Sequence, residues 1–463
     1  MTGHAPSTQV IAGARRMAFY YMIMMNKYEQ KMLYEAMRYV LRYIGTFVLA
    51  VVIMLSLLWG VAKIPRSGIQ EKMTESSEYL LAHPSLYRIV PSVRGSSIDL
   101  YADSVLLSIA YYLEPEDSIR SVMWANYYGI ESQEMLQYFS ESVDTDIPPN
   151  MDYLRYWHGS VVFVRLMHLF LNLKQIYIFH AILIAALTIL LISVLWRNQY
   201  KEEAIISGIA LSAVSIWFVP FCLEYTWVFL VMLVASVIAV NRAIQNKENW
   251  GIFFLITGMV TVYLDFLSAE TLTLLIPLLL ILRIQKDNIK KHYLWWLSVQ
   301  SCVSWIVGYL GMWITKWVMA SVILRIDVLP YVTGHIEERL GGGLCLTQSE
   351  FLKAAIIRNL ACMSPYGYGI YGAIVILILI FALVFRPVLM NELQICKRKN
   401  GGRIVLFLIL GGIPYIRFLI LHNHSVLHNP FTYRAQAATV MALCFVILEF
   451  VEHVPRKAVT SDA

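Results

Sequence analysis

Long blocks of apolar residues are the feature that most limits what this chain can fold into. Hydrophobic residues make up 58% of its 463 residues and charged residues only 15%, and the mean hydropathy is +0.60. The apolar residues stand in blocks of roughly 18 to 22, the length that a helix needs to cross a bilayer. The sequence therefore predicts an all-α polytopic membrane protein with about ten transmembrane helices. The predicted spans are 44–62, 175–196, 203–221, 223–240, 251–268, 270–284, 294–322, 368–388, 404–421 and 434–451.

Lys and Arg residues between the predicted spans indicate the orientation. Cytoplasmic connections are rich in these residues, and here the basic connections alternate with two short turns, 221–225 and 268–270, that contain none. The pattern predicts an even number of spans with both termini in the cytoplasm. The basic residues that support it are Arg15, Arg16, Lys27, Lys31, Arg38, Arg42, Arg197, Lys201, Arg242, Lys247, Arg283, Lys286, Lys290, Lys291, Lys397, Arg398, Lys399, Arg403, Arg456 and Lys457.

This orientation divides the chain into parts. Residues 17–43 mix Lys, Arg, Tyr and Met at helical spacing, which is typical of an amphipathic helix on the inner leaflet. The predicted parts are a cytoplasmic amphipathic segment (1–43), a first span (44–62), a large outer loop (63–174), a transmembrane bundle (175–452) with outer loops 323–367 and 421–434, and a cytoplasmic tail (453–463).

The motifs of several enzyme classes are missing from the sequence. It contains no Walker loop, no GxSxG elbow, no HExxH and no CxxC. The formal net charge of +6 comes from the inner basic loops and gives no reason to expect a nucleic-acid partner. Chemistry on the outer face would therefore need a substrate that arrives already activated.

The stretch "SSIDLYADSV" carries two acids, Asp99 and Asp103, in the large outer loop. On a helix, residues four apart share one face at about 6 Å, and partial burial would raise one pKa toward the range of a general base. The alternative is a helix start with its acids in the first turn, facing solvent. Spacing alone favours that alternative.

Cationic residues stand near the outer ends of the predicted spans. The segment 153–173 predicts an amphipathic helix at the outer interface, with Tyr156, Trp157 and His158 at headgroup depth. Trp157 is explained as an aromatic anchor. Arg155 and His158 are candidates to bind a lipid phosphate.

Charged residues within spans are costly, about 2.5–3.5 kcal/mol at the bilayer centre, so each is a functional candidate. Asp265 and Lys316 stand out, and a buried structural pair between them is equally compatible with the sequence. Arg417 lies toward the outer end of its span and Arg434 opens the last one. Both could hold an anionic headgroup.

Three histidines, His422, His424 and His428, follow in the outer loop 421–434. Their spacing matches no standard zinc site. A metal site and hydrogen bonding to a phosphate or sugar both remain open.

Together, these stretches resemble the GT-C superfamily of membrane glycosyltransferases, and most closely uncharacterised multi-spanning membrane proteins of Gram-positive bacteria. The stretches that carry the resemblance are "SIDLYADSVLL", "YLRYWHGSVVFVRLMHLFLNLKQIYI", "YLDFLSAETLTLLIPLLL", "GYLGMWITKWVMASVI" and "NHSVLHNPFTYRAQ". GT-C enzymes use polyprenyl-phosphate-linked sugars and carry a catalytic acid in the first outer loop, often in a DxD pair.

The resemblance implies roles for the candidate residues. Asp103 or Asp99 would be the general base, although their spacing departs from DxD, which leaves open which acid acts and whether a divalent metal ion takes part. The candidates to hold the lipid phosphate or the donor are Arg155, His158, Lys316, Arg417, Arg434, His422 and His424. The implied location is the bacterial cytoplasmic membrane, with the active site on the extracytoplasmic face.

Three functions are compatible with these features. The first is transfer of a sugar from a polyprenyl-phosphate carrier to a surface glycan, teichoic acid or lipid. The second is a polysaccharide polymerase or ligase, a class that typically has its largest outer loop late in the chain, whereas here it comes first. The third is a transporter or flippase for lipid-linked glycans, which predicts two similar halves with paired broken helices; the sequence shows no internal repeat.

Overall fold

The structure, a computed structural model, describes residues 27–130, 135–247, 249–286, 291–340, 347–363, 393–395, 401–449 and 451–453. Among these residues are eighteen α-helices and only four three-residue strands. Six of the described helices are long and apolar enough to cross a membrane: Glu29–Ala62, Leu173–Arg197, Leu223–Ile244, His292–Leu324, Gly401–Ile420 and Asn429–Leu448. The prediction of an all-α membrane protein is confirmed. The count of about ten spans stays a prediction, and the predicted span 368–388 lies outside the described residues.

The chain forms two compact units, residues 1–52 and 53–463. Helix α2, Lys27–Ala62, is a single helix of 36 residues. It runs unbroken across residue 43, the predicted boundary between the cytoplasmic segment and the first span. No Pro or Gly stands between residues 27 and 44 to end it.

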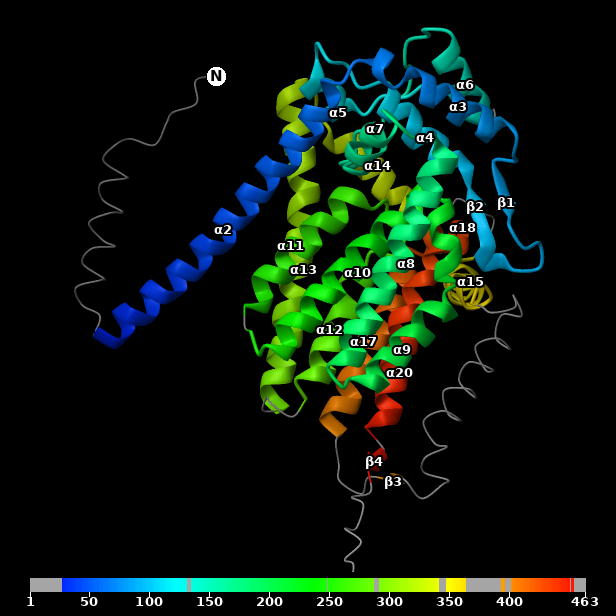
Figure 1. The fold of residues 1–463 in the computed structure, drawn as a ribbon. Helices are drawn as coiled ribbons and strands as arrows, with labels where there is room; N and C mark the ends of the chain where they lie inside the picture. Colours follow the sequence, from blue (N-terminus) through cyan, green and yellow to red (C-terminus); the bar gives the residue numbers. More distant parts are fainter. Residues whose placement is uncertain are drawn as a thin grey trace, which may run out of the picture. The chain divides into compact units, whose positions relative to one another are not determined.

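Most of the predicted outer loop 63–174 is a folded layer, here called the cap (residues 63–172). The strands β1 and β2 pair in antiparallel register, with Leu86 opposite Asp99, and β2 leads directly into α4. Figure 1 shows the cap lying over one end of the long helices. Its elements are η1 (Arg66–Gly68), α3 (Gln70–Leu81), β1 (Leu86–Arg88), η2 (Arg94–Ser96), β2 (Ser97–Asp99), α4 (Leu100–Tyr111), α5 (Ser118–Trp124), α6 (Met135–Asp144) and α7 (Ser160–Met167).

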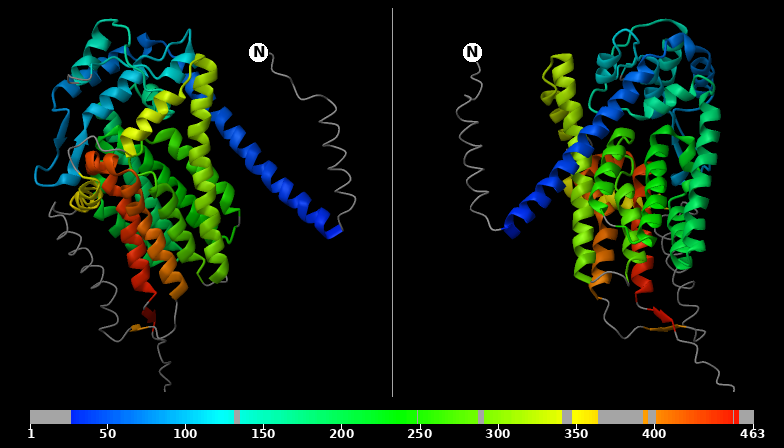
Figure 2. Two further views of the ribbon diagram at one scale, coloured as in Figure 1. Left: turned by 180° about the vertical axis from the view of Figure 1, so that it is seen from behind. Right: turned by 60° about the vertical axis from the view of Figure 1, so that its left-hand side comes forward.

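The long helices run side by side beneath the cap and form the bundle (Figures 1 and 2). We call its two ends the cap end and the far end. The bundle helices are α8 (Leu173–Arg197), α9 (Lys201–Ala213), α10 (Leu223–Ile244), α11 (Trp250–Leu264), α12 (Leu272–Ile284), α13 (Lys291–Leu324), α17 (Gly401–Ile420) and α20 (Ala437–Leu448).

The predicted outer loops 323–367 and 421–434 are also largely helical where they are described. They contain α14 (Leu329–Leu340), α15 (Gln348–Leu360), α18 (His422–Leu427), α19 (Asn429–Thr432) and the start of η4 (Tyr433–Gln436). Helices α14, α15 and α17 all contact α18. A short ladder of β3 (Leu393–Ile395) with β4 (Val451–His453) completes the described elements.

One predicted span, 203–221, is not a single helix. The α-helix α9 ends at Ala213, and a 3-10 helix, η3 (Ile216–Phe221), follows. Ser215 between them has a φ of 54°, a left-handed conformation that an α-helix does not continue through. This break brings Cys222 and the start of α10 to the underside of the cap, where Cys222 contacts Asp103.

Two glycines let α11 and α13 pack closely against each other. A Cβ built on Gly258 of α11 would lie 2.2 Å from the carbonyl oxygen of Trp305, and one built on Gly308 of α13 would lie 2.2 Å from that of Leu255. Small residues at such crossings let two membrane helices approach closely. This contact fixes the position of α13, whose cap-end half borders the candidate site.

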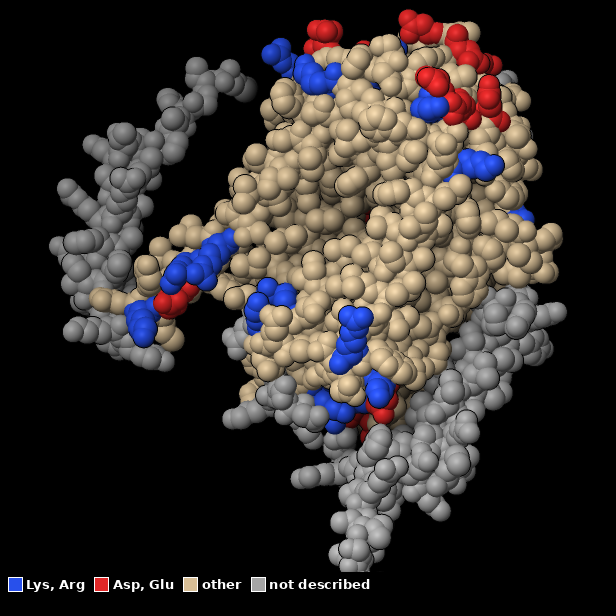
Figure 3. Space-filling model, in the orientation of Figure 1, with Lys and Arg blue, Asp and Glu red and all other residues tan. Residues whose placement is uncertain are grey.

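Charge is distributed unevenly between the two ends of the bundle. Figure 3 shows most of the acidic side chains on the cap, together with some Lys and Arg, whereas the exposed charges at the far end are mainly basic. The basic residues at the far-end termini of the bundle helices include Arg197, Lys201, Arg242, Arg283 and Arg403. These five residues are among those that, in the sequence, predict cytoplasmic connections.

Candidate functional site

A polar cavity of about 370 Å³ lies where the cap meets the bundle. Its wall combines α4 with Tyr127 and the cap segment 153–158, the first turn of α10, and the 424–428 region. Of the residues proposed as the base or as donor ligands, Asp99, Arg155, His158 and His424 line it. The other lining residues are Tyr101, Ala102, Val105, Leu106, Ile109, Tyr127, Tyr153, Tyr156, Glu224, Phe266, Leu427 and His428.

Asp99 lines this cavity from the junction of β2 and α4. It is the N-cap of α4, and its side chain accepts a hydrogen bond from the Ala102 backbone N–H at 3.0 Å. Burial raises the pKa of Asp99, although backbone hydrogen bonds from Ala102 and Tyr101 partly oppose that shift. Asp99 therefore starts the helix, with Asp103 in its first turn, as the alternative drawn from the spacing expects, but Asp103 is buried and does not face solvent. Asp99 is a partly exposed carboxylate held in place by the start of a helix.

Asp103 does not line the cavity. It is fully buried and accepts hydrogen bonds from the Tyr177 hydroxyl, from the Cys222 thiol at 3.4 Å, and from the Leu223 N–H at 2.9 and 3.1 Å. Leu223 is the first residue of α10, so the carboxylate caps that helix and joins the cap to two spans, α8 and α10. Burial raises the pKa of Asp103 to about 7, with the hydrogen bonds opposing the shift.

Arg155 presents a positive charge to the cavity. Its guanidinium stacks on the Tyr153 ring at 3.9 Å from the ring centre, and its Nη1 donates to the Tyr331 hydroxyl at 3.1 Å and lies 3.2 Å from His335 Nε2. None of the ion pairs among the described residues includes Arg155. Its buried Nε has no hydrogen-bond partner there either. A planar guanidinium that is not paired with an acid can bind a phosphate.

Arg155 and Tyr156 also line a second hollow, an apolar groove of about 190 Å³ that we call the α13–α14 groove. Arg155 and Tyr156 are therefore shared by the walls of both hollows. The remaining lining residues of the groove are Leu267, Tyr309, Leu310, Trp313, Trp317, Val332, His335, Ile336, Leu340 and Leu421.

His158, Tyr156 and Trp157 are all buried in the protein, and their position at headgroup depth stays a prediction. The predicted bounds of the helix over 153–173 are wrong, since α7 begins only at Ser160 and ends at Met167. His158 has a φ of 54°, and the next residue, Gly159, bonds through its N–H to the Tyr263 carbonyl at 2.8 Å. A side chain on Gly159 would collide with the Tyr263 ring at 2.3 Å, so the turn requires glycine. This turn joins the cap to the end of α11 through the bond from Gly159 to Tyr263.

The ring of His158 is neutral. Its Nε2 lies 2.9 Å from the Tyr153 carbonyl and must carry the proton that is donated there. Burial lowers the pKa of His158 to about 3. The remaining Nδ1 has no partner among the described residues, so its chemistry is that of a hydrogen-bond acceptor.

His424 reaches the cavity from α18, with Arg417 directly behind it. Arg417 pairs with Glu270 (Nε to Oε1, 2.9 Å), donates to Ser425 Oγ at 3.1 Å and lies 3.4 Å from His424 Nδ1. Its charge is therefore compensated by Glu270. His422 faces away, near the Leu419 carbonyl, and does not line the cavity.

The structure places Lys316, Arg434 and Asp265 outside the cavity, each with its own partners. Lys316 donates to the carbonyls of Val122 and Met123, both at 3.0 Å, at the end of α5. Cations are favoured beside the last carbonyls of a helix. The Lys316–Asp265 pair, one of two readings of the sequence, does not form.

Asp265 instead accepts from the Ser268 N–H at 3.1 Å and from the Ser268 hydroxyl, closing a local turn. Arg434 donates to the Gly95 carbonyl at 3.0 Å and the Pro430 carbonyl at 2.7 Å. These bonds join the 430–436 segment to the cap at Gly95, which lies just before β2 and Asp99.

Sequence reasoning did not assign site roles to the aromatic wall of the cavity. Tyr101, Tyr127, Tyr153 and Phe266 line it together with Glu224. Glu224 carried a usable signal, an acid at the cap end of an apolar span, whereas tyrosines are too frequent in this chain to mark a site. No group of three or more His, Cys, Asp or Glu side chains in the described ranges is arranged to hold a metal ion.

Comparison with known proteins adds no relative. No protein-family model, curated protein or solved structure matches this chain.

Proposed function

We propose that the protein is a membrane glycosyltransferase that moves a sugar from a polyprenyl-phosphate carrier to an acceptor hydroxyl, with Asp99 as the general base. One observation carries the proposal. Arg155, a guanidinium with no acidic partner among the described residues, lines both the α13–α14 groove and the polar cavity, and Asp99 lines that same cavity. An apolar tail, an anionic link and a polar sugar are the three parts of such a donor, in the same order.

Each part of the donor would bind the surface that matches its polarity. The groove is lined almost wholly by apolar and aromatic side chains and suits the lipid chain. Arg155 offers a planar fork of N–H groups that matches a phosphate. The tyrosines of the polar cavity supply ring faces and hydroxyl groups for a sugar.

The reaction needs one proton transfer and one displacement. The Asp99 carboxylate accepts the proton of an acceptor hydroxyl, whose oxygen forms a bond to the anomeric carbon of the sugar. The bond from that carbon to the phosphate oxygen breaks, and its electron pair leaves with the lipid phosphate. Arg155 stabilises the charge on that leaving group, and the anomeric centre inverts.

The raised pKa of Asp99 agrees with this role, because a base is most effective when its pKa approaches the working pH. His158 Nδ1, an acceptor on the same wall, would receive a hydrogen bond from a sugar or acceptor hydroxyl.

The proposal includes a location. The exposed charges at the far end of the bundle are mainly Lys and Arg, whereas the cap carries most of the acidic side chains (Figure 3), and an excess of basic residues favours the cytoplasmic side. The cap and the polar cavity would then face the outside of a bacterial cytoplasmic membrane. The acceptor would be a surface glycan, teichoic acid or lipid.

Purified protein in nanodiscs tests this function directly. A panel of polyprenyl-phosphate hexoses with radiolabelled sugar is incubated with membrane lipid and wall-glycan extracts, and labelled products are separated from donor. Covalent transfer supports the proposal.

Movement of intact donor across a vesicle membrane without transfer would instead identify a flippase. A polysaccharide polymerase or ligase, the other alternative, is favoured by His424 and His428 on the cavity wall. It would transfer preformed oligosaccharides and leave single sugars unused.

A further inference from the structure

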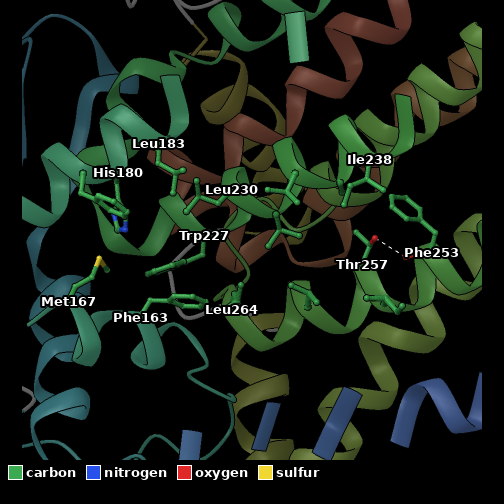
Figure 4. Close-up of a pocket in the computed structure, with 16 residues that line it drawn as sticks. Phe163, Met167, His180, Leu183, Trp227, Leu230, Ile238, Phe253, Thr257 and Leu264 are labelled. Atoms are coloured by element: carbon green, nitrogen blue, oxygen red, sulfur yellow. Dashed lines mark hydrogen bonds between the residues drawn. The ribbon is translucent and has the colours of Figure 1, made fainter. Parts of the chain in front are cut away.

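A third hollow lies on the side of the bundle, between α8, α10, α11 and the cap helix α7 (Figure 4). We call it the α8–α11 groove. It measures about 500 Å³ and shares no lining residue with the polar cavity or the α13–α14 groove. It is lined by Phe163, Met167, Phe179, His180, Leu183, Trp227, Leu230, Val231, Val234, Ala235, Ile238, Phe253, Ile256, Thr257, Val260 and Leu264.

The wall of this groove is almost entirely apolar. Thr257 is its one hydroxyl, and that group already donates to the Phe253 carbonyl at 2.8 Å, the dashed line in Figure 4. Water is disfavoured in such a groove, because an apolar wall offers it no hydrogen-bond partners. Since α8 and α10 are long enough to span a membrane, a hydrocarbon chain of the bilayer is the natural occupant.

Two polar side chains stand together toward the cap end of the groove. The rings of His180 and Trp227 meet edge to face at 5.2 Å, and Figure 4 shows them side by side. Both residues are at least 97% buried. His180 Nδ1 and Trp227 Nε1 have no hydrogen-bond partner among the described residues. Indole N–H groups usually find a partner when buried, so this pair points to an acceptor supplied by a ligand.

The length of the groove matches one leaflet. Trp227 and Ile238 both line it from α10, eleven residues apart, which is about 16 Å along a helix. The hydrocarbon core of a bilayer is about 30 Å thick, so one leaflet accounts for about 15 Å. An acyl chain that enters from the cap end would reach the midplane near Ile238, with its ester group at the level of Trp227.

We propose that the α8–α11 groove binds one acyl chain of a bilayer glycerolipid, with the ester carbonyl accepting a hydrogen bond from Trp227 Nε1 beside His180. A polyprenyl chain fits less well, because it carries no carbonyl and runs far beyond one leaflet. The proposal does not rest on glycosyl transfer, and it gives the protein a second lipid site that is separate from the donor site.

Native mass spectrometry of the detergent-purified full chain tests the site. We expect one glycerolipid to remain bound to the wild type. Val234→Trp fills the groove with an indole and should remove that lipid. Val318→Trp is the matched control, since Val318 is similarly exposed on α13 but lines none of the three hollows. Both variants are first checked for monodisperse elution.

The hydrogen bond is tested with added lipids and does not depend on a folded variant. Diacyl phosphatidylglycerol should bind the wild type about fivefold more tightly than its dialkyl ether analogue, the effect of one net hydrogen bond. Trp227→Phe should erase that preference. Equal binding of ester and ether lipid, equal retention by the Val234→Trp and Val318→Trp proteins, or a polyprenyl lipid as the retained species would each overturn the proposal.

Discussion

Asp99 and Asp103 stand one helical turn apart in the sequence, yet they face different surroundings. Asp99 caps α4 and lines the polar cavity, while Asp103 is fully buried and accepts two hydrogen bonds from the first N–H of α10. Neutralising the two acids is therefore expected to have different effects on the protein. Loss of Asp99 should remove activity from a folded protein, and loss of Asp103 should loosen the attachment of the cap.

The pKa of Asp103 predicts how stability depends on pH. Its folded-state pKa is raised by burial from 3.8 to about 7, so between these values the folded protein holds a proton that the unfolded chain releases. This contribution is present at low pH and is lost as the pH rises through about 7. Asn at this position carries no proton to release. The melting temperature of the wild type minus that of Asp103→Asn should therefore increase from pH 8 to pH 5.

Scanning fluorimetry in detergent at both values measures this difference. Asp117→Asn serves as the control, since its side chain is 61% exposed and its substitution should give the same difference at both pH values. A pH-independent difference for Asp103→Asn would show that the carboxyl is ionised throughout this range.

Arg155 should determine affinity for the donor. Arg155→Gln removes the charge from the mouth of the α13–α14 groove, and hydrogen bonds to charged groups contribute about 1.5–3 kcal/mol. Binding of a polyprenyl phosphate should weaken about tenfold or more. Arg155→Lys keeps the charge but lacks the planar fork of N–H groups. Its affinity for the polyprenyl phosphate should therefore lie between those of the wild type and Arg155→Gln.

Arg417→Lys is the comparison for Arg155, because Arg417 is already paired with Glu270. Its effect should appear in the melting temperature. Donor binding that is weakened by Arg417→Lys as strongly as by Arg155→Gln would move the phosphate site toward α18.

The α11–α13 crossing should tolerate no added methyl group. Gly258→Ala places a Cβ 2.2 Å from the Trp305 carbonyl oxygen, and overpacking of this kind costs about 1–3 kcal/mol. The melting temperature should fall clearly. Gly208→Ala, on α9 with open space at its Cβ, should leave it unchanged or raise it. Equal melting temperatures for the two variants would mean that these helices do not cross at Gly258.

Helix type was predictable from the sequence, but the partners of charged groups were not. An apolar block of span length identifies a helix from local residues alone, as for 175–196, which lies within α8. The partner of Lys316 proved to be the end of α5, more than 190 residues earlier, rather than Asp265. The rotation of each helix and the fold of the cap depend on such distant contacts, which no window of sequence contains.

The candidate site was predictable to the same limited degree. Asp99, Arg155, His158 and His424 were identified by residue type, and the structure brings all four to one cavity. Arg434 and Lys316 carry the same kind of charge but bind backbone carbonyls. In the sequence, a cation that binds backbone carbonyls cannot be distinguished from a cation that binds a ligand.

The most direct test compares two isosteric variants in one assay. Initial rates of sugar transfer from a polyprenyl-phosphate donor are measured in nanodiscs for the wild type, Asp99→Asn and Asp103→Asn, each normalised to folded protein. Asn retains the cap on α4, so Asp99→Asn should fold normally and lose about a hundredfold or more in rate, as expected when a general base is removed. Asp103→Asn should keep most of its rate per folded molecule. Full activity in Asp99→Asn, or a loss confined to Asp103→Asn, would contradict the assignment of Asp99 as the base.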